Sequence, residues 1–162
     1  MFKGSEVQRL VNIVRRLHYE ERLFYDADFE VILIFTNLQL KTMKTFRELL
    51  VCQKSMSFVT EIYKVSKSFL DDENFVLSSQ IRKSAISVPS NISEGYGRDG
   101  LKDYLRFLNI AIASLFELQT QLEIAYNLEY IKEEKFNSLY DLSREIERML
   151  SSFIRTIKSR RN

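Results

Sequence analysis

The sequence contains very little glycine, proline, cysteine or histidine. Four Gly and one Pro among 162 residues fall far below the usual combined share of about 12%. Because all-β folds use both residues in their many turns, this composition argues against an all-β fold. The single Cys, Cys52, excludes an intramolecular disulfide framework and indicates a reducing compartment. With His18 as the one His, few residues are left for a zinc site, and we expect neither a metal nor a cofactor.

Long apolar runs are also absent from the sequence. The longest, at residues 31–35, is far shorter than the about 20 residues that span a bilayer. The first residues lack the charged, apolar and small-residue order of a signal peptide. We therefore expect a cytoplasmic protein without membrane contact.

The residues that are present favour helices. Hydrophobic residues make up 45% of the chain and charged residues 28%, which suits a soluble domain with a substantial core. Apolar residues recur at three- and four-residue steps through four long segments joined by short connections. This pattern predicts an all-α fold, an antiparallel up-down-up-down four-helix bundle. The predicted helices cover about residues 45–69, 73–96, 99–127 and 133–158.

Several residues predict how these helices begin, bend and end. Thr45 and Glu48 have the spacing of a capping box at the first helix. Pro89 interrupts the second helix, which predicts a kink there, or two half-helices. Gly95 and Gly97 are expected to stop it, because glycine readily adopts the left-handed C-cap conformation. The apolar arc of the third helix is broad, which indicates a central helix or one that contacts another subunit.

Residues 1–42 do not fit the bundle pattern. Residues 5–17 have helical periodicity, whereas the β-branched and aromatic run at 29–35 prefers strand. A lone strand beside four helices has no partner to pair with. We predict a bundle domain at 43–162 and an N-terminal extension at 1–42 that is poorly ordered or not native, with Met43 as the natural start.

No set of catalytic residues stands out in the sequence. Cys52 has no His within the predicted bundle to activate it, and the bundle lacks the Glu-x-x-His pairs of a di-iron site. Residues 95–100 match G-x-G-x-x-G, but they follow a helix rather than a strand, so a helix cap and turn explains them better. We expect no enzymatic activity.

One group of basic residues is a candidate for nucleic-acid binding. The net charge of +2 is too small to indicate such binding by itself, and the basic residues at 155–161 also suit a helix C-terminus. Basic residues near Tyr96 and Tyr104, however, can hold phosphates while aromatic rings stack on bases. The alternative is an ordinary solvated face. The candidate residues are Arg82, Lys83, Arg98, Lys102 and Arg106.

An unusual polar segment surrounds the proline. Pro89 frees a carbonyl near Ala85, and Ser90 or Asn91 is placed to satisfy loose backbone groups. Glu94 lies one helical turn before Arg98 and can pair with it. We interpret the segment as a structural motif rather than a ligand site. Its members are Pro89, Ser90, Asn91, Glu94, Gly95, Tyr96 and Gly97.

Several segments between Met43 and Lys158 together form a family pattern. They are residues 46–51 (FRELLV), 80–85 (QIRKSA), 87–98 (SVPSNISEGYGR), 104–108 (YLRFL) and 117–122 (ELQTQL). In these segments the chain resembles the 23S rRNA intervening-sequence proteins, also called four helix bundle proteins. A related group serves diversity-generating retroelements as accessory proteins. Cys52 stands where the family favours Trp.

The resemblance implies an antiparallel four-helix bundle that assembles into a homopentameric ring and has no known enzymatic activity. By analogy with the retroelement proteins, it also implies binding to RNA or DNA and to a reverse transcriptase. Arg82, Lys83, Arg98 and Arg106 lie in the matched segments. The expected function is therefore nucleic-acid binding through a basic ring surface, and the alternative is a protein-binding scaffold with no nucleic-acid role.

Overall fold

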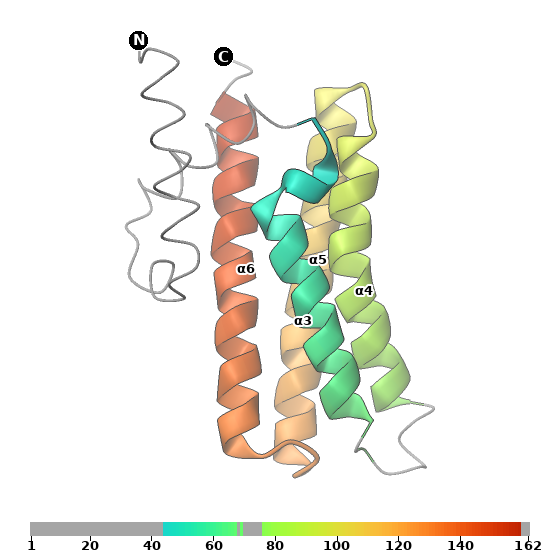
Figure 1. Cartoon of the computed structure of the whole chain (residues 1–162), viewed down its shortest axis with the longest axis vertical. Coiled ribbons are helices and arrows are strands. Elements are labelled where there is room, and N and C mark those ends of the chain that lie inside the picture. Colours follow the sequence, from blue (N-terminus) through green and yellow to red (C-terminus); the bar gives the residue numbers. More distant parts are fainter. Residues whose placement is uncertain (1–43, 68, 70–75, 160–162) are drawn as a thin grey trace.

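Four antiparallel helices make up most of the chain that the computed structural model describes, namely residues 44–67, 69 and 76–159. Each helix packs against two neighbours in the cyclic order α3, α4, α5 and α6 (Figure 1). No strand occurs within these described ranges, and the predicted all-α up-down-up-down bundle is confirmed. The predictions for residues 1–42 and for Met43 lie outside them. The elements are η1 (Phe46–Glu48), a 3-10 turn, and the helices α3 (Leu50–Ser66), α4 (Leu77–Tyr96), α5 (Leu101–Asn127) and α6 (Glu133–Ser159).

Aliphatic side chains from all four helices fill the core. Because apolar residues repeat at helical spacing, each helix turns one stripe inward and leaves a polar face outside. Phe58 and Phe153 are among the largest fully buried side chains. Each helix also contributes fully buried aliphatic residues, such as Ile62 in α3, Ile92 in α4, Leu115 in α5 and Ile146 in α6.

The first predicted helix begins in two steps. After η1, Leu49 is extended and fully buried, which anchors the chain in the core before α3 begins. The hydroxyl of Thr45 accepts a hydrogen bond from the backbone N–H of Arg47 at 3.0 Å. The carboxylate of Glu48 accepts one from the backbone N–H of Lys44 at 3.2 Å. Thr45 and Glu48 therefore cap the 3-10 turn, but the carboxylate reaches one residue farther back than in a standard capping box.

α4 runs through Pro89 as one continuous helix, so the predicted alternative of two half-helices is wrong. The Asn91 amide donates to the backbone carbonyl of Ser87 at 2.8 Å and to its hydroxyl at 3.0 Å, rather than to a carbonyl near Ala85. The Ser87 hydroxyl also lies 2.8 Å from the hydroxyl of Ser114 in α5. The polar motif around the proline thus ties α4 to α5.

The two glycines at the end of α4 act differently from the prediction. Gly97 caps the helix with φ −79°, and no described glycine has a positive φ, so the predicted left-handed cap is wrong. Gly95 is buried within the last turn, where a β-carbon would lie 2.9 Å from Tyr104 Cδ2 and 2.9 Å from Phe107 Cβ. Gly95 is therefore needed for close packing of α4 on α5, the most extensive helix contact in the bundle.

The left-handed conformation occurs instead at the end of α5, where Glu129 has φ 60°. The backbone N–H of Tyr130 donates to the carbonyl of Ala125, and that of Glu129 donates to Tyr126, each at 2.9 Å. This pair of hydrogen bonds is the Schellman pattern, in which the left-handed position is usually glycine.

Ion pairs join α3 to α6 along the remaining side of the bundle. Lys54 Nζ lies 2.7 Å from Glu145 Oε1, and the Glu145 side chain is buried. Nearer the other end, Glu61 contacts Lys135 and Lys64, each at 2.7 Å. Hydrogen bonds from these two lysines lower the pKa of the Glu61 carboxyl to about 2.

Candidate nucleic-acid interface

The five predicted basic residues separate into two places. Arg82 and Lys83 lie in the first half of α4, whereas Arg98, Lys102 and Arg106 surround the turn from α4 to α5, at the upper end in Figure 1. Arg82 lies fourteen residues before the end of α4, which corresponds to about 21 Å along the helix axis. The structure therefore brings together the last three residues, which we name the turn cluster, but not all five.

Arg82 has a structural partner at the end of α3. Its Nε donates to the hydroxyl of Ser66 at 2.7 Å, and its Nη2 donates to the Ser66 carbonyl at 3.0 Å. The guanidinium also lies over the Tyr63 ring, 5.3 Å from the ring centroid. A cation that bonds the last carbonyl of a helix stabilises its C-terminus. Lys83 is exposed and forms no ion pair with another described residue.

Two arginines of the turn cluster converge on one aromatic ring. The guanidinium carbons of Arg98 and Arg106 lie 4.8 Å and 4.9 Å from the centroid of the Phe107 ring. Such cation–π contacts orient a guanidinium without using its hydrogen-bond donors. Lys102 is exposed beside them and has no ion pair with the described residues. The turn cluster thus combines two oriented guanidinium groups with one free ammonium group.

Two acidic residues lie next to the turn cluster. Arg98 Nη2 pairs with Glu94 Oε1, as the sequence predicted. Arg106 Nε lies 3.7 Å from Asp103 Oδ1. Both pairs are solvent-exposed, so each contributes little to stability. Since a guanidinium carries five N–H donors, both arginines retain donors for a phosphate.

The tyrosines near the turn cluster face inward. The Tyr104 ring packs edge-on against Tyr96, with centroids 6.5 Å apart, and against Phe153 at 5.9 Å. Tyr96 in turn contacts Phe46 at 6.5 Å. Burial raises the pKa of the Tyr104 phenol above its usual value. These rings stabilise the end of the bundle, and the turn cluster therefore lacks the exposed tyrosine rings on which bases were expected to stack.

A second basic group, which the sequence reasoning missed, follows the outer face of α6. We name it the α6 stripe, and its members are Arg144, Arg148, Arg155 and Lys158. Their spacing of four, seven and three residues places all four on one helix face. Arg148 is half-buried and the others are exposed. Only the basic tail at 155–161 was noticed in the sequence, although this spacing is a readable signal.

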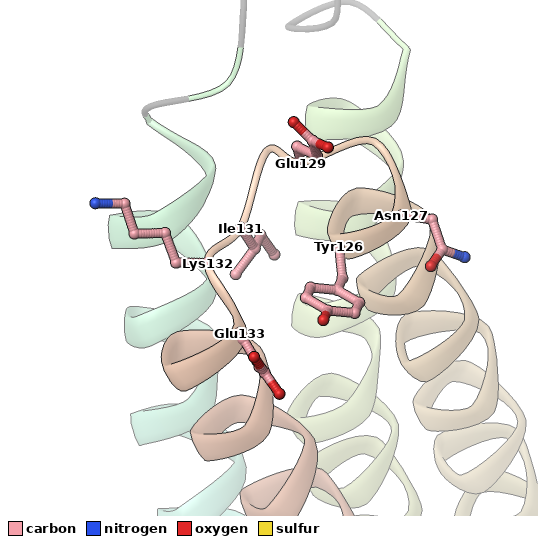
Figure 2. A pocket seen from close by; sticks show the side chains of 6 residues that line it. All are labelled: Tyr126, Asn127, Glu129, Ile131, Lys132 and Glu133. Carbon is pink, nitrogen blue, oxygen red and sulfur yellow. The ribbon is translucent and has the colours of Figure 1, made fainter.

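A shallow hollow of about 510 Å³ lies at the turn from α5 to α6, at the opposite end from the turn cluster. Figure 2 shows the side chains of Lys132 and Asn127 pointing to opposite sides of this turn, so its polar groups do not converge. None of the predicted basic residues lines it. The lining residues are Tyr126, Asn127, Glu129, Ile131, Lys132 and Glu133.

The remaining chemistry of the described residues is limited. Cys52 is buried, and burial raises the pKa of its thiol, which lowers its reactivity as a nucleophile. Among these residues we find no cluster of three or more His, Cys, Asp or Glu that could hold a metal ion. Likewise, no helix of the described part is long and apolar enough to cross a membrane.

The geometry can now be compared with known proteins. The sequence model of the family described as 23S rRNA-intervening sequence protein matches residues 47–152, which include parts of η1 and α6 and all of the three helices between them. The chain belongs to this family. The match includes the whole turn cluster and the first two members of the α6 stripe, whereas Arg155 and Lys158 lie beyond it. No curated protein matches the chain.

A solved structure supports the same fold. It is a protein with unknown function from the S23 ribosomal protein family of Bacteroides thetaiotaomicron, with 33% sequence identity and a TM-score of 0.62. The similarity covers 65% of this chain and 96% of that one. The family and the bundle are thus established, and the function of this chain is a separate question.

Proposed function

We propose that this protein is a non-enzymatic, oligomeric member of the 23S rRNA-intervening sequence protein family that binds RNA or DNA through the turn cluster. The observation that carries this proposal is the convergence of Arg98 and Arg106 on the Phe107 ring. Oriented guanidinium groups are well suited to phosphate oxygens, because their planar N–H donors match the phosphate geometry. In an oligomer, symmetry would repeat this cluster and strengthen its positive field.

Salt-dependent binding tests the proposal. We expect a fluorescein-labelled RNA strand to bind at low salt, with an affinity that falls steeply as salt rises, because phosphate contacts release counterions. Arg98→Gln and Lys102→Gln should each weaken binding and reduce the salt slope by about 1. Lys83→Gln, an exposed lysine outside the turn cluster, is the matched control and should leave the slope unchanged. Absence of binding at low salt, or an affinity independent of salt, would contradict the proposal.

A second candidate function, a protein-binding scaffold, is favoured by a different surface. Residues 55–60 of α3, 84–93 of α4 and 107–116 of α5 carry no charge, and we name these three stretches the uncharged belt. The Ser87–Ser114 hydrogen bond sets the α4 stretch beside the α5 stretch. Met56, Ile86 and Ile110 are exposed on the belt. Grouped exposed apolar side chains are typical of protein contacts, either with further copies or with a partner such as a reverse transcriptase.

The two candidates differ in one measurement. If the purified chain binds no RNA at low salt and instead retains a protein partner from its native host, the scaffold is favoured. Steep salt dependence that requires the turn cluster favours nucleic-acid binding. Self-association through the uncharged belt is compatible with both, since it uses a different part of the surface.

A further inference from the structure

The α6 stripe lies beside the most exposed aromatic side chain among the described residues, Phe116 of α5, which is 47% exposed. Gln119 of α5 donates to the Ser143 hydroxyl at 3.1 Å and to Glu147 Oε2 at 3.2 Å, so this flank of α5 faces α6. Phe116 precedes Gln119 by three residues, and residues at that spacing are neighbours on a helix surface. Phe116 therefore lies on the flank of α5 next to α6.

The same contacts connect this flank to the α6 stripe. Arg144 Nη1 donates to Glu147 Oε2 at 2.6 Å, the oxygen that also accepts from Gln119. Arg148 follows Arg144 by four residues and extends the basic surface along α6. The surface around Phe116 is thus continuous with a row of cationic side chains.

Acidic residues near this surface are engaged by other groups. Glu147 is held by Arg144 and Gln119. Glu145 pairs with Lys54 toward α3, and the Glu117 carboxylate accepts a hydrogen bond from Gln121 at 3.1 Å. The face between α5 and α6 therefore has a positive character and one large exposed ring.

We propose that the face formed by Phe116 and the α6 stripe binds single-stranded RNA or DNA, with the Phe116 ring stacked on a base and the stripe paired with phosphates. This inference rests on the proposed function and adds a second contact area with its own strand preference. A positively charged groove and aromatic stacking are the combination by which proteins hold single strands. In a duplex the base faces are covered by neighbouring bases, so Phe116 distinguishes the two forms.

The occupant follows from charge complementarity. A polyanion matches the α6 stripe, whereas an uncharged surface of a second copy would leave these cations without counter-charge. Six residues separate Ile110 of the uncharged belt from Phe116, which places the two side chains about 120° apart around α5. The two residues therefore serve different faces.

A tryptophan reporter tests this inference. The chain contains no Trp, so the Phe116→Trp variant has one indole, placed on the face in question. We expect a single-stranded oligonucleotide of mixed sequence to quench its fluorescence at low salt, and added salt to restore it. The matched control is Ile86→Trp, on an α4 position that is 41% exposed within the uncharged belt. Its fluorescence should not change.

Affinity gives the second readout. Phe116→Leu should weaken single-strand binding about tenfold and leave duplex binding unchanged, whereas Phe116→Tyr should retain wild-type affinity. If the wild-type chain binds the strand but Phe116→Trp is not quenched and Phe116→Leu binds normally, the stacking site is wrong and the turn-cluster proposal stands. If the wild-type chain binds no nucleic acid, both fail. A change in oligomer mass on Phe116→Leu would also overturn the inference, because it would make this face a contact between copies.

Discussion

At the scale of single residues, the most informative position is one where the backbone requires a residue that the sequence does not supply. Glu129 occupies the left-handed position of the turn after α5. A side chain with a β-carbon is strained there, because the β-carbon comes too close to the carbonyl oxygen that follows. Glycine avoids this strain, and for that reason it is the usual residue at such a turn.

We predict that Glu129→Gly stabilises the bundle by about 1 kcal/mol. Urea denaturation, followed by circular dichroism, gives the free energy of unfolding. Glu129→Ala is the control, because it removes the carboxylate but keeps the β-carbon, and it should leave stability nearly unchanged. If both variants stabilise equally, the carboxylate rather than the backbone is responsible.

The sequence could not have predicted the roles of the glycines from composition alone. Glycine scarcity drew attention to residues 95–100, and the expected role was a left-handed cap. In the structure Gly95 serves packing, because Tyr104 and Phe107 occupy the space of its β-carbon. Which residue opposes a given helix position is set by the register between two helices, and that register is not visible in one helix's own periodicity.

At the scale of elements, the packing of α4 on α5 is the most sensitive contact. We predict that Gly95→Ala destabilises the protein by about 1–3 kcal/mol, because the added methyl group forces the two helices apart. Thermal or urea unfolding measures the loss. At Gly97 a β-carbon would meet its nearest atom, the Glu94 carbonyl oxygen, at an ordinary 3.6 Å. Gly97→Ala is therefore the matched control, and an equal loss in both variants would contradict this account.

Helix bounds were the part of the fold most readable from the sequence. The predicted ends of the third and fourth helices, near Asn127 and Lys158, agree with α5 and α6 to within one residue. The prediction succeeds because apolar periodicity is nearly unbroken there and breaks at the connections. The separate η1 turn was not predicted, since it depends on how the buried Leu49 enters the core.

The candidate site was only partly readable. The pairing of Glu94 with Arg98 follows from helical spacing alone. By contrast, nearness in sequence suggested that Arg82 and Arg98 act together, but a helix separates residues along its axis as it advances. Phe116 was overlooked as a surface residue because helical periodicity does not show which flank of a broad apolar arc the neighbouring helices leave uncovered.

At the scale of the whole molecule, self-association follows from the uncharged belt and from the family resemblance. We predict that light scattering at micromolar concentration gives about five times 19.2 kDa, the mass of one chain. Ile86→Glu places a charge on the belt and should lower that mass, since burying an unpaired charge is costly. Ile124→Glu changes an isoleucine that is 43% exposed outside the belt and should have no effect. A wild-type mass of 19.2 kDa would rule the oligomer out.

The even number of helices also sets how the molecule responds to force. Since α3 and α6 are antiparallel neighbours, residues 44 and 159 both lie toward the upper end in Figure 1. Tension applied between these two positions pulls the first and last helices apart sideways, like a zipper, rather than sliding them past each other. The load would reach the Lys54–Glu145 ion pair before the Glu61–Lys135 pair. Mechanical resistance in this direction therefore depends on single ion pairs broken in turn, while the close packing of α4 on α5 is left intact.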